Sequence, residues 1–90
     1  MGLYTRHAEE QLLERNVSKA EVEEAVEKPD ELLKDSFGTN IAHKKLVRKG
    51  KAVLLRVFYD ETAEGKKILT VYLTTKISKY YRGWNEGSLR

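Results

Sequence analysis

The chain has 90 residues, of which 34% are charged, a net charge of +3 and no cysteine. This length supplies one small hydrophobic core and is too short for two, while the missing thiols exclude disulfides, cysteine-based zinc sites and thiol catalysis. No apolar run approaches the roughly 18 residues that a membrane helix requires, so we expect a cytoplasmic protein that makes no membrane contact.

The charges are divided unevenly along the chain. Residues 1–37 contain five Lys or Arg against ten Asp or Glu, a net charge of −5, whereas residues 38–90 contain twelve against four, a net charge of +8. Clustered cations attract phosphates and release counterions on contact, which favours a polyanionic partner for the second half. The alternative is an acidic helical layer that balances a basic sheet within one domain.

The first predicted helix begins after Thr5, whose hydroxyl can cap it. Ala8, Leu12 and Arg15 recur in it at helical spacing, and Leu13 widens the apolar stripe. The helix should end near Asn16.

The second predicted helix has a clearer start. Residues 18–21 read Ser-Lys-Ala-Glu, which is a capping box, and Val17 with Val22 has the spacing of a hydrophobic staple. Pro29 disfavours continuation beyond Lys28, because the residue before a proline avoids the helical conformation.

Four strands are predicted after Pro29. The Lys49-Gly50 pair indicates a tight hairpin between the second and third of them. The third strand is apolar on both faces, which is typical of a central strand. The expected strands span residues 31–36, 40–48, 51–59 and 66–77.

These elements predict an α+β fold, in which two N-terminal helices pack on one face of a four-stranded antiparallel sheet. We expect one domain over residues 1–82 and a flexible tail over residues 83–90. Strand alternation divides the side chains between the two faces. The helix-facing set is Val53, Leu55, Val57, Tyr59, Leu69, Val71, Leu73 and Ile77. The opposite face holds Leu54, Arg56, Phe58, Thr70, Tyr72, Thr74 and Lys76, and is open unless another chain covers it.

Neither histidine has further ligands at a recognised metal spacing, so we expect no metal and no cofactor. His7 lies in the first turn of the first helix, where it either caps the helix or serves as a general acid or base. His43 lies beside Lys44 and Lys45, and we expect a solvated edge position for it.

Arg56 stands within an apolar run, where a charge is costly unless it is paired or used. Either a carboxylate satisfies it, with Glu9, Glu14 or Asp35 as candidates, or it binds phosphate on the open sheet face. Arg15 has the same ambiguity at the C-terminal end of the first helix, and there we favour capping over phosphate binding.

The segment from Thr74 to Arg82 brings two tyrosines close to hydroxyls and cations. Such a mixture suits stacked bases and phosphates, although it also suits simple anchoring of the C-terminal segment to the core. Our candidate RNA-binding residues are Lys45, Lys76, Lys79, Tyr80 and Arg82.

Several of these runs resemble the small prokaryotic domains grouped as domain of unknown function 4258. The resemblance covers residues 4 to 81, and it includes a His-Ala helix start, an Arg before a Val-Ser turn, an acidic second helix and a closing Thr-x-Tyr and Thr-x-Lys strand. It rests on Thr5-Arg6-His7-Ala8, Glu14-Arg15-Asn16-Val17-Ser18, Glu21-Val22-Glu23-Glu24-Ala25-Val26, Pro29-Asp30 and the run from Leu69 to Tyr80.

In size and element order that family looks like the RelE-type toxins, which include metal-independent ribonucleases. The resemblance implies a catalytic set of His7, Arg15, Arg56 and Thr74, in which His7 is the acid or base, the arginines clamp phosphate and Thr74 donates a hydrogen bond. Partners would then be RNA or the ribosome, together with an antitoxin protein. The alternative is a non-enzymatic domain that binds another protein or forms a homodimer through its open sheet face.

Overall fold

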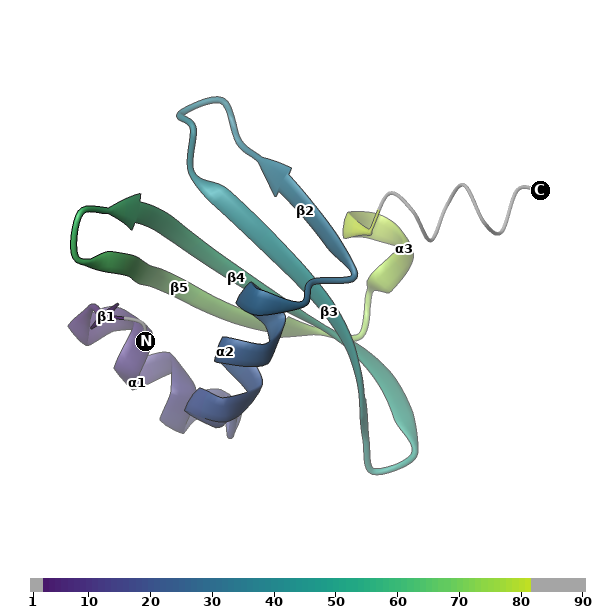
Figure 1. The fold of residues 1–90 in the computed structure, drawn as a ribbon. Coiled ribbons are helices and arrows are strands. Elements are labelled where there is room, and N and C mark those ends of the chain that lie inside the picture. The colour runs from purple at the N-terminus through teal and green to yellow at the C-terminus, as the bar shows by residue number, and fades with distance from the viewer. Residues whose placement is uncertain (1–2, 82–90) are drawn as a thin grey trace.

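The computed structural model describes residues 3–81, which form the fold shown in Figure 1. The α+β prediction is confirmed: two N-terminal helices pack against a mostly antiparallel sheet of five strands, in the order β1-β5-β4-β3-β2. In chain order the elements are β1 (Leu3–Tyr4), α1 (Arg6–Arg15), α2 (Lys19–Glu27), β2 (Glu31–Lys34), β3 (Asn40–Arg48), β4 (Lys51–Thr62), β5 (Gly65–Thr74) and α3 (Ile77–Tyr80). The predicted tail over residues 83–90 lies outside the described residues.

Local signals placed both N-terminal helices correctly, although Leu13, which we expected in the apolar stripe of the first helix, is 85% exposed. The Thr5 hydroxyl accepts a hydrogen bond from the Ala8 amide at 3.0 Å, and Asn16, with a left-handed φ of 56°, caps the C-terminal end of α1. At α2 the capping box is complete, with Ser18 and Glu21 each accepting a hydrogen bond from the other's backbone amide. These contacts satisfy amides that have no partner within the helix.

The hairpin between β3 and β4 is also confirmed. Lys49 and Gly50 have φ values of 52° and 76°, and two consecutive positive φ angles are what a two-residue turn of the type I′ class requires. This turn sets the register of the central pair, so that Arg48 lies opposite Lys51 and His43 lies opposite Arg56. The sheet therefore has a defined row of side chains across it.

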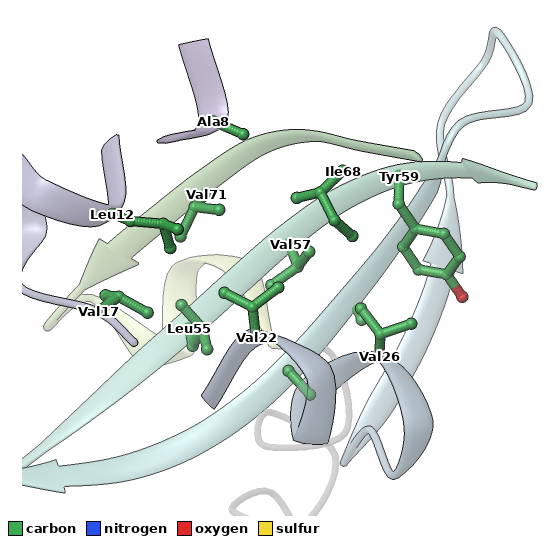
Figure 2. Close-up of a cluster of buried hydrophobic side chains, with 12 residues drawn as sticks. Ala8, Leu12, Val17, Val22, Val26, Leu55, Val57, Tyr59, Ile68 and Val71 are labelled. Carbon is green, nitrogen blue, oxygen red and sulfur yellow. The ribbon is translucent and has the colours of Figure 1, made fainter. Parts of the chain in front are cut away.

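The main core lies between the sheet and the two N-terminal helices, as Figure 2 shows. Leu55, Val57 and Val71 are fully buried there, as the strand pattern predicted. The prediction is wrong for Leu69, because a register shift beside Tyr59 lets Ile68 enter the core instead. Such a bulge reverses the side chain alternation beyond it.

The face opposite α1 and α2 is not fully open, because α3 packs on it. Leu54, which precedes the core residue Leu55 in β4, is fully buried against Ile77 and Tyr81. Two expectations are thereby corrected: β5 ends at Thr74 instead of Ile77, and Ile77 belongs to this second cluster and not to the helix-facing core. Figure 1 shows α3 apart from α1 and α2.

The edge of the sheet beside β5 carries a strand that the sequence pattern did not reveal. β1 pairs in parallel with β5 over Leu3 and Tyr4, opposite Lys67 and Ile68. Two residues are too few to display an alternation, so this strand is visible only in the fold. No helix within residues 3–81 is long and apolar enough to cross a membrane.

Candidate functional site

Four side chains form a row across the α3 face of the sheet. The strand registers place Glu31 of β2 opposite His43 of β3, His43 opposite Arg56 of β4, and Arg56 opposite Tyr72 of β5. Residues opposed in this way share one face, with their Cβ atoms about 5 Å apart. We refer to these four residues as the polar row.

His43 is the buried centre of the polar row, with an exposed fraction of 0%. Its Nδ1 atom lies 2.8 Å from Glu31 Oε1, and its Nε2 atom lies 3.1 Å from Arg56 Nε. A guanidinium can only donate hydrogen bonds, so Nε2 must accept and the ring proton must be on Nδ1. His43 is therefore a neutral imidazole that donates to Glu31 and accepts from Arg56.

The expected solvated edge position for His43 is wrong for two reasons. β2 pairs on the outer side of β3, so β3 is an interior strand of the sheet. In addition, the ring of Tyr81 lies 6.2 Å from the imidazole and covers it. Neither the position of β2 nor that of Tyr81 follows from the residues next to His43 in the chain.

Burial lowers the pKa of His43 from its ordinary value of 6.5, and the positive charge of Arg56 lowers it further. Glu31 acts in the opposite direction, through its hydrogen bond and its negative charge, without reversing the shift. At neutral pH the ring is therefore uncharged, in agreement with the two hydrogen bonds that it makes.

This lowered pKa predicts that acid destabilises the fold through His43. The unfolded chain binds the proton more readily than the folded one, so stability is fully present above about pH 6.5 and falls as the pH drops through the folded pKa. Urea unfolding between pH 8 and pH 5 should show this loss in the wild type and in His7→Gln, because His7 is exposed. His43→Gln should lose less stability over the same range, and an identical loss in all three proteins would contradict the assignment.

Arg56 finds its partners in His43 and in aromatic rings, and not in any of the candidate carboxylates Glu9, Glu14 and Asp35. Its guanidinium carbon lies 4.1 Å from the ring centre of Tyr80, 5.1 Å from that of Phe58 and 6.0 Å from that of Tyr72. Within residues 3–81 its only hydrogen bond uses Nε. The two Nη groups have no hydrogen-bond partner there. Neither is a buried atom, so both are accessible to solvent.

A second arginine reaches one of these rings, that of Tyr72, from the other side of the sheet. Arg15, the last residue of α1, has its guanidinium carbon 5.0 Å from the ring centre of Tyr72. β1 pairs with β5 only at Lys67 and Ile68. At Tyr72, β5 is therefore an edge strand of the described sheet, and the Arg15 side chain reaches Tyr72 past this edge. Its Nε is buried and has no hydrogen-bond partner in the described part of the chain, and α1 is capped instead by the Asn16 backbone.

Tyr80 completes what we call the arginine–tyrosine cluster, which consists of Arg15, Arg56, Tyr72 and Tyr80. The rings of Tyr72 and Tyr80 meet edge to face with their centres 6.1 Å apart. A hydrogen bond with Tyr72 lowers the pKa of Tyr80, and the charges of Lys79 and Arg56 lower it further. The cluster thus joins two guanidinium groups and the phenol of Tyr80 around the ring of Tyr72.

Three predicted RNA-binding lysines lie around this face. Lys79 Nζ is 5.3 Å from the ring centre of Tyr80, and Lys45 Nζ is 4.8 Å from that of Tyr81. Lys76 is exposed in the turn before α3. The predicted contact Arg82 lies outside the described residues.

The predicted catalytic residues are only partly brought together. Arg15 and Arg56 converge on Tyr72, whereas Thr74 is buried and accepts a hydrogen bond from the Lys76 amide, which shapes the turn into α3. His7 is exposed in the first turn of α1, about 12 Å along the helix axis from Arg15. The structure therefore gives His7 no place in the cluster.

Glu31 and His43 are the parts of the site that we missed. Their link to Arg56 depends on strand register. A sequence-based prediction of the pairing of β2 with β3 and of β3 with β4 would have placed Glu31 opposite His43 and His43 opposite Arg56. Among residues 3–81, no group of three or more His, Asp or Glu side chains is placed to hold a metal ion. What the cluster can offer is hydrogen-bond donors for an anion and rings for stacking.

The chain belongs to the family described as domain of unknown function DUF4258, whose sequence pattern matches residues 4–73. The matched region includes Glu31, His43, Arg56 and Tyr72 and stops before Tyr80. No curated protein and no solved structure matches the chain. The family resemblance drawn from the sequence is thus confirmed, while the likeness to RelE-type toxins has no support from a structural neighbour.

Proposed function

We propose that this member of the DUF4258 family binds single-stranded RNA on the α3 face of its sheet, through the arginine–tyrosine cluster. The observation that carries the proposal is the state of Arg56, whose guanidinium lies 4.1 Å from the Tyr80 ring centre while its Nη groups have no hydrogen-bond partner within residues 3–81. Paired N–H donors match the oxygens of a phosphate. The neighbouring ring edges and faces suit unpaired bases.

The charges around the cluster support a polyanionic ligand. Arg15 and Arg56 lie within it, and Lys45 and Lys79 lie beside tyrosines at its border. The excess of carboxylates in residues 1–37 is concentrated in the segment that forms α1 and α2, which pack on the other face. The carboxylates of these two helices thus lie on the other side of the sheet from the cluster, although the cations Arg48 and Lys66 lie beside α2.

The test is binding of a fluorescent single strand of about ten nucleotides, the length that such surfaces commonly cover. If four cations each neutralise one phosphate, the logarithm of the affinity should fall with the logarithm of salt concentration at a slope of about −3. An RNA duplex should bind more weakly, because its base faces are stacked inside, and the same DNA strand should bind more weakly because it lacks the 2′-hydroxyl. Absence of binding at about 50 mM salt would refute the proposal.

A second candidate function is cleavage of the bound RNA without a metal, and the environment of Tyr80 favours it. A base would take the proton of the ribose 2′-hydroxyl, the freed oxygen would attack phosphorus, and the 5′ oxygen would leave with a proton from an acid. Tyr80 suits the base, because the hydrogen bond with Tyr72 and the nearby cations stabilise its phenolate. His43 cannot contact substrate, since it is buried and both ring nitrogens are engaged.

Cleavage is tested with labelled RNA in EDTA. Tyr80→Phe keeps the ring for stacking and removes the hydroxyl, so it should abolish cleavage. Its affinity for RNA should stay within about threefold of the wild type, a smaller change than the loss of one charge-assisted hydrogen bond would cause. His7→Ala should cleave as the wild type does. Cleavage that survives in Tyr80→Phe would eliminate the role of Tyr80.

The protein-binding alternative has lost one of its supports. Leu54 and Phe58 lie on the sheet face that it would use, and an exposed apolar patch there would have favoured a protein interface. Leu54 is fully buried beneath α3, and Phe58 is half-buried with the Arg56 guanidinium above its ring. RNA binding is therefore the function that the described surface favours.

A further inference from the structure

The hydrogen-bond chain from Glu31 through His43 to Arg56 lies mostly beneath the surface that we assign to RNA. We propose that His43 is a positioning residue, which holds Arg56 by its Nε atom so that only the two Nη groups face the RNA phosphate, and that Glu31 keeps His43 in the tautomer this requires. The inference rests on the proposed RNA binding and deepens it, because it identifies what prepares the phosphate-binding group.

The geometry gives each member of the chain a separate task. Glu31 Oε1, 2.8 Å from Nδ1, retains the ring proton on that nitrogen and leaves the Nε2 lone pair for Arg56. Arg56 Nε, 3.1 Å from Nε2, donates its single proton to that lone pair. The opposite tautomer would set an N–H of the ring against the N–H of the guanidinium, and the contact would be repulsive.

A long arginine side chain is ordinarily free to adopt many rotamers, and ordering it on binding weakens affinity. Here the His43 hydrogen bond fixes one edge of the guanidinium, and the Tyr80 ring 4.1 Å away fixes its face. The remaining Nη edge is already oriented before a ligand arrives. His43 therefore acts on RNA only through Arg56.

Protonation of His43 should release Arg56, which gives the inference its own signature. The groups that face the ring are Glu31 from β2, Arg56 from β4 and Tyr81 after α3. An added proton on Nε2 would remove the acceptor and set two positive charges against each other. Affinity for RNA should then fall in mild acid. If binding depended only on attraction between the protein's positive charges and the phosphates, the added proton would instead raise the affinity.

The decisive experiment measures RNA affinity from about pH 8 to about pH 5, the range in which histidine titrates, and checks the folded state by circular dichroism at each pH. The wild type should lose roughly tenfold in affinity, the effect of one charge-assisted hydrogen bond. His43→Gln retains an oxygen acceptor that does not titrate, so it should keep the affinity at pH 8 and lose the acid decline. His7→Gln, the same change at the exposed histidine, should show the same decline of RNA affinity in acid as the wild type.

Nitrogen NMR of the free protein tests the positioning without any RNA. The expected spectrum shows the Nδ1–H tautomer of His43 and an Arg56 Nε–H signal that exchanges slowly with water and weakens in His43→Leu. An Nε2–H tautomer, or an acid decline that persists in His43→Gln, would overturn the inference even where RNA binds. Absence of RNA binding at every pH would overturn the proposed function, and with it the inference, whatever tautomer the spectrum shows.

Discussion

Replacing Arg56 by alanine is expected to lower the affinity for single-stranded RNA by about 10- to 100-fold. A hydrogen bond to a charged group contributes about 1.5–3 kcal/mol, and each 1.4 kcal/mol is tenfold in affinity. In the structure this guanidinium is oriented by His43 and Tyr80, and its Nη groups have no other partner within residues 3–81. Its removal therefore takes away the phosphate contact that the proposal depends on.

Arg48→Ala is the matched control, because it removes the same charge elsewhere. Arg48 donates to Glu21 Oε1 at 2.7 Å and to the Asn16 carbonyl at 3.0 Å, which ties it to the start of α2. Its loss should change RNA affinity by less than about threefold, the effect of screened net charge alone. Equal losses in the two variants would show that binding is unspecific attraction to a basic protein.

Arg56→Ala also leaves the Nε2 atom of His43 buried without a donor, which costs about 1–3 kcal/mol of stability. Binding must therefore be compared at a temperature at which both variants are folded. Arg56→Lys supplies a second comparison, since it keeps the charge and loses the planar donor edge. It should bind more weakly than the wild type and more tightly than Arg56→Ala.

The second large effect concerns Leu54 and Leu55, neighbours in β4 that point to opposite faces and are both 0% exposed. Truncating either to alanine should lower the free energy of unfolding by about 2–5 kcal/mol, because each leaves a cavity in a packed cluster. For a domain whose total stability is of order 5–15 kcal/mol, that is a substantial fraction. Urea unfolding measures both losses directly.

RNA affinity should separate the two variants. Leu55 belongs to the core beneath α1 and α2, whereas Leu54 supports Ile77 and Tyr81 at the two ends of the α3 segment. Leu54→Ala should therefore displace Tyr80 and weaken RNA binding, while Leu55→Ala, folded under the same conditions, should bind nearly as the wild type does. Equal binding by the two variants would mean that the placement of α3 does not matter for RNA.

Local chemistry explains why much of the fold was predictable. The Thr5 cap, the Ser18–Glu21 capping box and the Lys49-Gly50 turn each depend on residues a few positions apart, and each occurs where the sequence indicated. Strand alternation then assigned most of the helix-facing core. It failed at Leu69 of β5, opposite the register shift beside Tyr59, because a bulge changes the alternation and cannot be recognised in the hydrophobic pattern.

The site was less predictable, because it depends on contacts between distant segments. Arg56 was recognisable as a charge within an apolar strand, and Tyr80 as an aromatic beside cations. Nothing near His43 in the chain indicates that it is buried, since Glu31 and Tyr81 reach it from other segments. His7 was a candidate acid or base because of its side-chain type and the family motif, but its position in the fold depends on where α1 lies relative to the sheet.

The most direct test of RNA binding on the α3 face is an amide NMR titration of the labelled protein with the single-stranded RNA. We predict that the signals of Arg56, Tyr72 and Tyr80 shift in proportion to the RNA added. Those of the exposed residues of α1 and α2, His7 among them, should remain in place. Shifts confined to α1 and α2, with Arg56 and Tyr80 unchanged, would contradict the proposed interface.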